Sequence, residues 1–239
     1  MHIEDIEYHA DGARLVGRLF VDQARAGKRP GVLVAPEGLG LSEHTFDIAT
    51  RLAEAGYVAF AMDYYGDGGT LPMDDIMPKI GAFMAQPETI RARAAEALKV
   101  LTSQAQTDPA KLAAIGFCFG GTTALELARS GAALGAVVGF HSGLGTSRPQ
   151  DAANIKAKVL VCIGAADPII PADQRAAFEK EMTDAKVDWR MNLYGGAGHS
   201  FTNPAVNALG RPGFAYHEAT ARRSWRAMID LFDEAFGPV

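Results

Sequence analysis

Short apolar segments alternate with amphipathic segments along most of the chain. The apolar segments predict strands at residues 31–35, 57–62, 111–116, 134–140, 158–164 and 187–194. The amphipathic segments predict helices at residues 43–55, 87–103, 121–129, 171–183 and 216–236. Strands that are apolar on both faces and separated by helices indicate a mostly parallel sheet with helices packed on both sides. We therefore expect one α/β domain that spans residues 1–239.

Two parts of the chain depart from this alternation. Residues 3–9 and 14–21 flank a turn at Asp11-Gly12, which predicts an antiparallel hairpin before the first parallel strand. Residues 64–86 are the least regular part, with several turn residues and the methionines Met73, Met77 and Met84. We expect them to form a cap over a site at the carboxyl edge of the sheet, where ligands of such sheets bind. The alternative is a surface excursion without a role.

Composition narrows the classes of function. The chain has 239 residues, of which 48% are hydrophobic and 21% are charged, as in ordinary globular proteins. A net charge of -5 argues against nucleic-acid and anionic-membrane partners, which attract basic surfaces. No segment has the run of about 18 apolar residues that a membrane span needs. The acidic first residues lack the pattern of a signal peptide, and the two cysteines form no disulfide-rich pattern. We expect a cytoplasmic protein, either a monomer or a homodimer.

The most informative short motif is Gly116-Phe117-Cys118-Phe119-Gly120. It has the G-x-C-x-G spacing of a nucleophile elbow, a sharp turn between a buried strand and a helix, with cysteine in place of the common serine. Glycines on both sides of the nucleophile suit a strained turn in which strand and helix approach closely. The turn places Cys118 at the N-terminus of the following helix, whose dipole favours the reactive thiolate. The alternative is a buried structural cysteine in a glycine-rich turn.

A thiol nucleophile usually needs a base, and the base needs an orienting carboxylate. Asp167 and His199 each follow a predicted strand, so both should reach the edge of the sheet where Cys118 lies. The order nucleophile, acid, histidine is that of the α/β-hydrolases. The alternatives are a turn aspartate before Pro168 and a loop histidine among glycines. His141 also follows a strand and is a second candidate for the base. The remaining histidines lie in the hairpin, at the start of a surface helix or in the last helix, and they are His2, His9, His44 and His217.

Glu37 is the second unusual residue, because it follows Pro36 at the end of a predicted buried strand. We expect its carboxylate to point into the same cleft as Cys118. Partial burial would raise the pKa of this carboxyl and make it a credible acceptor for the thiol proton. The alternative is a helix-capping or surface glutamate. Gly38 lets the backbone approach a ligand closely, and we expect the N–H groups of Gly38 and Phe119 to form an oxyanion hole.

These motifs together resemble those of a known family. The segments GFCFGG with Cys118, GAADPIIP with Asp167, GAGHSF with His199 and PEGLG with Glu37 are similar to those of the dienelactone hydrolases, in the α/β-hydrolase superfamily. The resemblance extends over about residues 1–236. It implies an α/β-hydrolase fold, with Cys118 as nucleophile and with Asp167 and His199 completing the triad. It also implies that Glu37 activates the thiol once substrate binds, that the oxyanion donors are those named above, and that no metal or organic cofactor is needed.

The chain departs from that family at the substrate. Family members that hydrolyse dienelactone hold its carboxylate with an arginine four residues after the histidine, where this chain has Asn203. A second arginine is expected in the cap, but the only cation in residues 64–86 is Lys79. Arg211 is a candidate substitute from the following loop. An unpaired carboxylate enters a cleft at a cost, so we expect a neutral, activated ester or lactone as substrate. The side chains expected at the substrate are Tyr64, Lys79, Ser200, Asn203 and Arg211.

The sequence thus predicts a cysteine-dependent hydrolase of small-molecule esters or lactones, which acts by acyl transfer through a thioester. We expect esterase and not peptidase activity, because amides have poor leaving groups, and a side reaction on phosphotriesters. Dienelactone hydrolysis proper is one alternative. Another is an amidotransferase, glyoxalase or stress-response protein with a cysteine in a similar turn. A third is a non-catalytic protein that binds a small ligand on a hydrolase fold.

Overall fold

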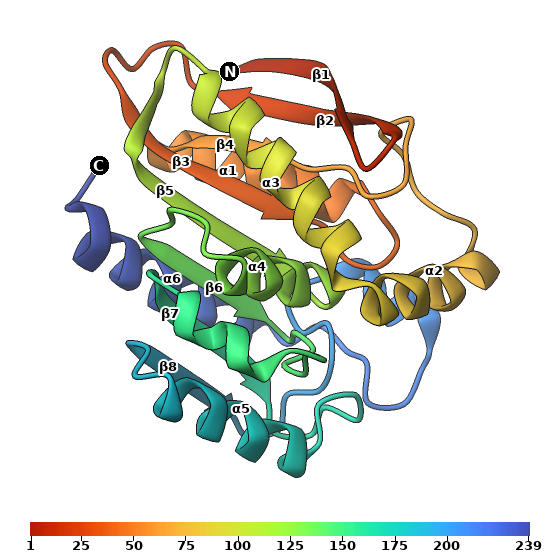
Figure 1. The fold of residues 1–239 in the computed structure, drawn as a ribbon. Helices are drawn as coiled ribbons and strands as arrows, with labels where there is room; N and C mark the ends of the chain where they lie inside the picture. The colour runs from red at the N-terminus through yellow and green to blue at the C-terminus, as the bar shows by residue number, and fades with distance from the viewer.

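A mixed sheet of eight strands forms the centre of the structure, a computed structural model that describes residues 1–239 (Figure 1). The strands are β1 (His2–Ala10), β2 (Ala13–Val21), β3 (Arg29–Ala35), β4 (Val58–Ala61), β5 (Thr107–Phe117), β6 (Ala136–Phe140), β7 (Lys158–Gly164) and β8 (Trp189–Tyr194). Their order in the sheet is β1-β2-β4-β3-β5-β6-β7-β8. β2 pairs antiparallel with both β1 and β4, and every pair from β4 to β8 is parallel.

Helices cover both faces of this sheet (Figure 1). They are α1 (Glu43–Ala55), α2 (Met73–Ala85), α3 (Pro87–Ser103), α4 (Phe119–Arg129), α5 (Ala172–Asp184) and α6 (Glu218–Phe236), with short 3-10 helices η1 (Pro149–Asn154) and η2 (Pro204–Leu209). α3, α4 and α5 pack on one face, and α1 and α6 pack on the other. This confirms the expected α/β-hydrolase fold, a mostly parallel sheet with an N-terminal hairpin. None of the helices is both long and apolar enough to cross a membrane.

The two faces of the central strands account for the apolar segments of the sequence. In β3, Leu33 and Ala35 belong to the core beneath α3 and α4, whereas Val32 and Val34 belong to the core beneath α1 and α6. A strand that is buried on both faces has no solvent-facing positions, so its apolar segment is continuous. Burial of one valine or leucine side chain contributes roughly 1.5–3 kcal/mol to the free energy of unfolding.

Local signals place many element ends correctly. α1, α3 and β7 begin and end at the predicted residues. α1 ends where Gly56 adopts a left-handed conformation with φ 109°, and its N–H bonds back to carbonyls of the last turn. The predicted hairpin is confirmed as β1 and β2, whose register pairs Ala10 with Ala13 across the turn.

Residues 64–86 are more regular than the sequence suggests. The expectation of an irregular segment is wrong for α2, a helix that carries Pro78 in its interior, where proline normally argues against a helix. α2 lies against the loop after β3, because a Cβ atom added to Gly38 would come within 2.6 Å of Ile80 Cδ1. The outer side of α2 leaves Met73 and Met77 exposed. Part of the segment therefore lies against this loop, and its role as a cap stays a prediction.

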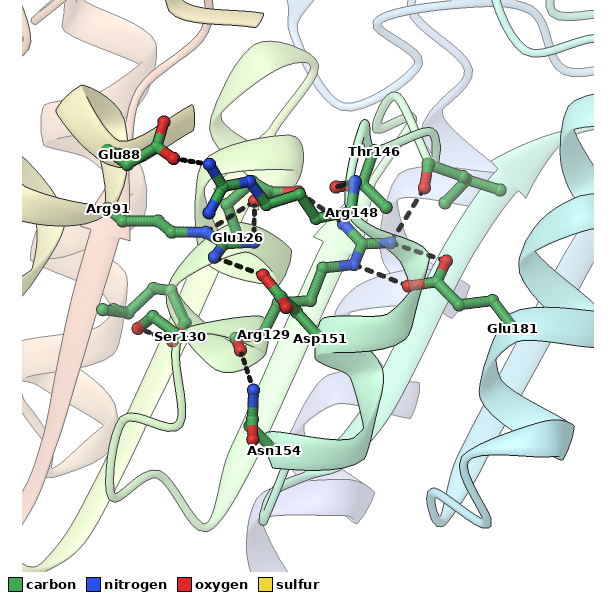
Figure 2. A network of polar contacts seen from close by, with 12 residues as sticks. Glu88, Arg91, Glu126, Arg129, Ser130, Thr146, Arg148, Asp151, Asn154 and Glu181 are labelled. Carbon is green, nitrogen blue, oxygen red and sulfur yellow. Dashed lines mark hydrogen bonds and ion pairs between the residues drawn. The ribbon is translucent and has the colours of Figure 1, made fainter. Parts of the chain in front are cut away.

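A buried ionic network joins α4 to its neighbours (Figure 2). Arg129 is fully buried and donates to both carboxylate oxygens of Glu181 on α5 at 2.8 and 2.9 Å, and to Glu126 at 3.0 Å. Glu126 also accepts from Arg91 of α3 at 2.8 Å, and Arg91 donates to Asp151 of η1 at 2.6 Å. Each charge in the network has a partner, so the network holds α3, α4, α5 and η1 in one arrangement.

Candidate active site

The turn between β5 and α4 has the geometry of a nucleophile elbow. Cys118 lies at its tip with φ 53° and ψ -117°, a backbone conformation that residues other than glycine rarely adopt. Both flanks require glycine. A Cβ atom on Gly116 would overlap the backbone of Gly120, and one on Gly120 would overlap the Ala35 carbonyl. The Cys118 side chain is partly exposed, whereas Cys162 is buried, so Cys118 is not a buried structural cysteine.

Asp167 and His199 form a hydrogen-bonded pair at the same edge of the sheet, after β7 and β8. His199 Nδ1 lies 2.8 Å from Asp167 Oδ2, and both side chains are buried. The other carboxylate oxygen of Asp167 accepts the backbone N–H of Ile169 at 2.8 Å. The backbone N–H of His199 donates to Gly213 O at 2.7 Å. These bonds fix both side chains relative to the sheet.

The charge of His199 follows from its neighbours. Burial alone lowers the pKa of His199, but hydrogen bonds to Asp167 and to the Cys118 thiol outweigh burial and raise it to about 10. The imidazole is therefore protonated at neutral pH. One ring nitrogen of His199 thus faces Asp167, and Cys118 lies close enough to the ring to raise its pKa.

Glu37 lies after β3, largely buried between two polar side chains. Asn203 Nδ2 donates to Glu37 Oε2 at 2.7 Å, and His44 Nδ1 lies 3.6 Å from the same oxygen. Burial raises the pKa of Glu37, but the contacts with His44 and Asn203 and the charge of His199 lower it below its ordinary value. The expected rise in the pKa of Glu37 is therefore wrong, because its neighbours stabilise the carboxylate more than burial destabilises it.

His44 is not the surface residue that the sequence suggests. Its side chain is buried and its ring lies edge-on to Phe117, with 5.0 Å between the ring centroids. Neither ring nitrogen has a hydrogen-bond partner. A signal for this burial was present in the sequence, since His44, Ile48 and Leu52 recur at the spacing of one helix face.

The two expected oxyanion donors, the backbone N–H groups of Gly38 and Phe119, take no part in the regular hydrogen bonds of the helices and strands. Gly38 is held by Tyr65, whose hydroxyl donates to the Gly38 carbonyl at 2.7 Å, while the Gly38 N–H donates to no acceptor in the protein. Phe119 is the first residue of α4, where an amide has no carbonyl one turn earlier in the helix. Both amides therefore have the backbone setting that a donor to a ligand requires.

The other residues expected at the substrate lie in different environments. Tyr64 is fully buried and its hydroxyl donates to Pro36 O at 3.0 Å, so the expected contact of Tyr64 with substrate is wrong. Ser200 is buried beside His199 with a φ of 54°, and Lys79 is exposed on α2. Asn203 donates to Glu37, and its side-chain oxygen caps η2. Of this group, Asn203 and Ser200 are the nearest to the other candidate residues. Asn203 contacts Glu37, and Ser200 follows His199 in the chain.

Arg211 lies one aromatic ring away from the Asp167–His199 pair. Its guanidinium carbon is 4.2 Å from the ring centroid of Phe214, and the Phe214 ring lies edge-on to His199 with 4.9 Å between centroids. Arg211 is exposed. Its charge is thus near the site, with the Phe214 ring between it and His199.

His141 contacts the nucleophile through the backbone. Its Nδ1 accepts the Cys118 N–H at 3.1 Å, and its Nε2 lies 2.8 Å from Thr202 Oγ1. Burial, followed by the charge of His199, holds the pKa of His141 well below its usual range. A nitrogen that accepts from a backbone N–H is unprotonated, so His141 is neutral with its proton on Nε2. No ring nitrogen is left to face the thiol, which argues against His141 as the base. Thr202 is a residue of the site that sequence reasoning missed.

A pocket of about 380 Å³ opens beside Glu37. Its wall includes His44 and Asn203, both of which contact Glu37. The other lining residues are Leu39, Leu41, Ser42, Glu43, Phe46, Thr70 and Ala205. The wall thus combines apolar and polar side chains with one glutamate, and it holds no lysine or arginine. Nowhere in the structure are three His, Cys, Asp or Glu side chains grouped as ligands of a metal ion.

The loop order on the sheet and the elbow between β5 and α4 are those of an α/β-hydrolase. The sequence model of the dienelactone hydrolase family matches residues 16–236. The chain therefore belongs to the dienelactone hydrolase family, and it is a hydrolase of that type.

Two solved structures are similar over nearly the whole chain. A protein named m3DLH shares 47% identity with this chain, with 98% of each chain covered and a TM-score of 0.96. A dienelactone hydrolase-like promiscuous phosphotriesterase from metagenomic libraries shares 41% identity, with 99% of each chain covered and a TM-score of 0.94. A curated protein of Salmonella typhimurium, provisionally named a carboxymethylenebutenolidase, is 30% identical over 225 residues, which cover 90% of this chain and 81% of that protein.

Proposed function

We propose that this chain hydrolyses activated carboxylic esters with aryl or short-chain groups, or lactones, by acyl transfer through a thioester on Cys118. The observations that carry the proposal are the hydrogen bond between Asp167 and His199 and the effect of Cys118 on the pKa of the same imidazole. A carboxylate, an imidazole and a thiol together are the parts that nucleophilic acyl transfer needs. Membership in the dienelactone hydrolase family supports the same class of reaction.

In the acylation step, the sulfur of Cys118 attacks the carbonyl carbon of the ester, and the carbonyl oxygen takes the negative charge. We assign the N–H groups of Gly38 and Phe119 to this oxygen, since loss of one such donor slows catalysis by about 10²–10³. His199 is protonated at neutral pH and gives its Nε2 proton to the leaving oxygen. The C–O bond breaks, the alcohol leaves, and the acyl group stays on the sulfur.

The proton of the thiol goes to a different group, because His199 already carries one. We assign this step to Glu37, whose neighbours favour its ionised form. In deacylation, the now neutral His199 takes a proton from water while the oxygen attacks the thioester carbon, and the carboxylic acid is released. Asp167 keeps the proton of the neutral ring on Nδ1, so that Nε2 faces the reacting atoms.

The charges around the site support a neutral substrate. Glu37 is held ionised, and the side chain that contacts it most closely, Asn203, is neutral. No lysine or arginine lines the pocket beside Glu37. A substrate carboxylate would meet Glu37 without a partner, which disfavours its binding. Dienelactone hydrolysis proper is the competing candidate, and it requires Arg211 to reach around the Phe214 ring and pair with the substrate carboxylate.

Hydrolysis of phosphotriesters is a second candidate function, favoured by the 41% identity to a promiscuous phosphotriesterase. The Cys118 sulfur can attack phosphorus as it attacks a carbonyl carbon, with displacement of an aryloxide. We expect wild type to hydrolyse paraoxon faster than Cys118→Ala. Equal rates in the two proteins would exclude this side activity.

A series of p-nitrophenyl esters, combined with intact-mass detection of acylated protein, tests the main proposal. Wild type should release p-nitrophenolate and gain the mass of one acyl group, and Cys118→Ala should do neither. His199→Ala should lose turnover. Unchanged activity in Asp167→Asn would favour an amidotransferase-like or stress-response chemistry, and ligand binding without turnover or adduct would favour a non-catalytic binding protein.

A further inference from the structure

The proton that Glu37 takes from the thiol needs a further destination. This inference rests on the role proposed above for Glu37. The contacts of Glu37 favour its ionised form, since they hold its pKa below the ordinary value. A thiol has an ordinary pKa of about 8.5, so a proton that reaches this carboxylate is held weakly there. The proton therefore has to move on to another group or return to the sulfur.

His44 is the neighbour of Glu37 that can accept it. Asn203 also contacts Glu37 Oε2, but an amide does not take up a proton near neutral pH. His44 Nδ1 lies 3.6 Å from the same oxygen, and both ring nitrogens of His44 are buried without a partner. A buried polar group without a hydrogen bond costs about 1–3 kcal/mol. An apolar ring would pack against Phe117 without that cost, so packing alone does not explain an imidazole here.

His44 also stands between Glu37 and the pocket of about 380 Å³, whose wall it helps to form. The charged and titratable groups around it come from several elements. Glu37 lies on the loop after β3, and Glu43 lines the same pocket. His141 directly follows β6. The guanidinium carbon of Arg18 on β2 lies 4.3 Å from the ring centroid of the pocket residue Phe46.

We propose that His44 is a proton relay between Glu37 and this pocket. The proton passes from Cys118 Sγ to Glu37 Oε2 and then to His44 Nδ1, and His44 releases a proton from Nε2 to water in the pocket. Only S–H, O–H and N–H bonds change, so the step needs no further reactant. Nε2 is buried at rest, and its release of a proton requires a small movement of the ring or of the pocket wall. In this role His44 is a positioning and relay residue that acts on the sulfur only through Glu37.

Two variants distinguish a relay from a purely structural role. His44→Gln keeps a side-chain donor near Glu37, but its amide does not take up a proton near neutral pH. His44→Ala leaves space for a small ring. With p-nitrophenyl acetate, we expect the burst of p-nitrophenolate to be about 100-fold slower in both, the lower end of what general acid–base groups contribute. Imidazole and the more basic 4-methylimidazole should restore His44→Ala in order of their basicity. Pyrazole has the same shape and is far less basic, so it should restore little.

Three results would overturn the relay: a wild-type burst in His44→Gln, equal rescue by pyrazole and imidazole, or no rescue by either imidazole. Thermal unfolding followed by circular dichroism shows whether each variant folds, and if His44→Ala does not fold, the burst of His44→Gln decides alone. Glu37→Gln separates this inference from the proposed function. An unchanged burst in Glu37→Gln removes the role of Glu37 itself, whereas a slow burst there with a wild-type burst in His44→Gln removes only the relay.

Discussion

Replacement of Asn203 by aspartate places a second carboxylate against Glu37. In the wild type, Asn203 Nδ2 donates to Glu37 Oε2 at 2.7 Å, and this contact helps to lower the pKa of Glu37. Asparagine and aspartate have nearly the same shape, so Asn203→Asp replaces a donor by a negative oxygen with little change in packing. Two carboxylates this close cannot both be ionised at little cost. We therefore expect the pair to keep one proton near neutral pH.

The size of the effect follows from the distance. Oxygen atoms in hydrogen-bond contact put the two charge centres about 4 Å apart, and unit charges at this distance repel by about 4 kcal/mol at an effective dielectric constant of about 20. One pKa unit corresponds to about 1.4 kcal/mol, so this repulsion should raise the apparent pKa of the pair well above the ordinary value of a carboxyl. Glu37 is largely buried, so solvent screens this repulsion only weakly.

The stabilities of the two proteins should then depend on pH in opposite ways. In the wild type, folding lowers the pKa of Glu37, so this group stabilises the fold above its ordinary pKa and loses that contribution as the pH falls. In Asn203→Asp, folding raises the pKa of the pair, so the variant loses stability as the pH rises from the ordinary pKa of a carboxyl toward the raised one. We expect the free energies of unfolding to differ by about 3–4 kcal/mol near pH 7.5 and by less than about 1 kcal/mol near pH 4.5.

Urea unfolding at the two pH values measures this difference. Asn207→Asp is the matched control, because Asn207 is exposed on η2 and its side-chain oxygen accepts the Tyr216 N–H, a bond that aspartate keeps. The control should shift the free energy of unfolding by less than about 0.5 kcal/mol at either pH. An equal loss for Asn203→Asp at both pH values would refute the reasoning, because it would show that the two side chains do not titrate together.

Three further substitutions test the elbow, the ionic network and the cap. Gly120→Ala should lower the free energy of unfolding by more than about 3 kcal/mol in urea, because its Cβ would overlap the backbone of β3, whereas Gly145→Ala meets nothing and should change it by less than about 0.5 kcal/mol. Arg129→Met leaves the buried carboxylate of Glu181 without a partner and removes one of the two partners of Glu126, so it should cost about 3–5 kcal/mol, against less than about 1 kcal/mol for Arg148→Met at an exposed ion pair; equal losses would contradict this. Ile80→Ala should raise kcat/KM for bulky p-nitrophenyl esters about 10-fold relative to the acetate, and a uniform change would place α2 away from the substrate.

The sequence by itself determined the sheet and the residues at its carboxyl edge. Continuous apolar segments mark strands that are buried on both faces, and Gly56 marks the end of α1 through its left-handed backbone. The glycines around Cys118 mark a turn in which no larger residue fits. These signals are local: each depends on residues that lie within a few positions along the chain, so they can be interpreted without the fold.

Only the tertiary structure decided the environment of Glu37. Its donor, Asn203, is 166 positions away along the chain, and its neighbour His44 turns inward on α1. Whether burial or hydrogen bonding controls the pKa of a carboxyl depends on which distant side chains reach it, and composition or spacing does not contain that information. The same reason explains the burial of Tyr64 against Pro36, because packing against the rest of the molecule overrides local preference.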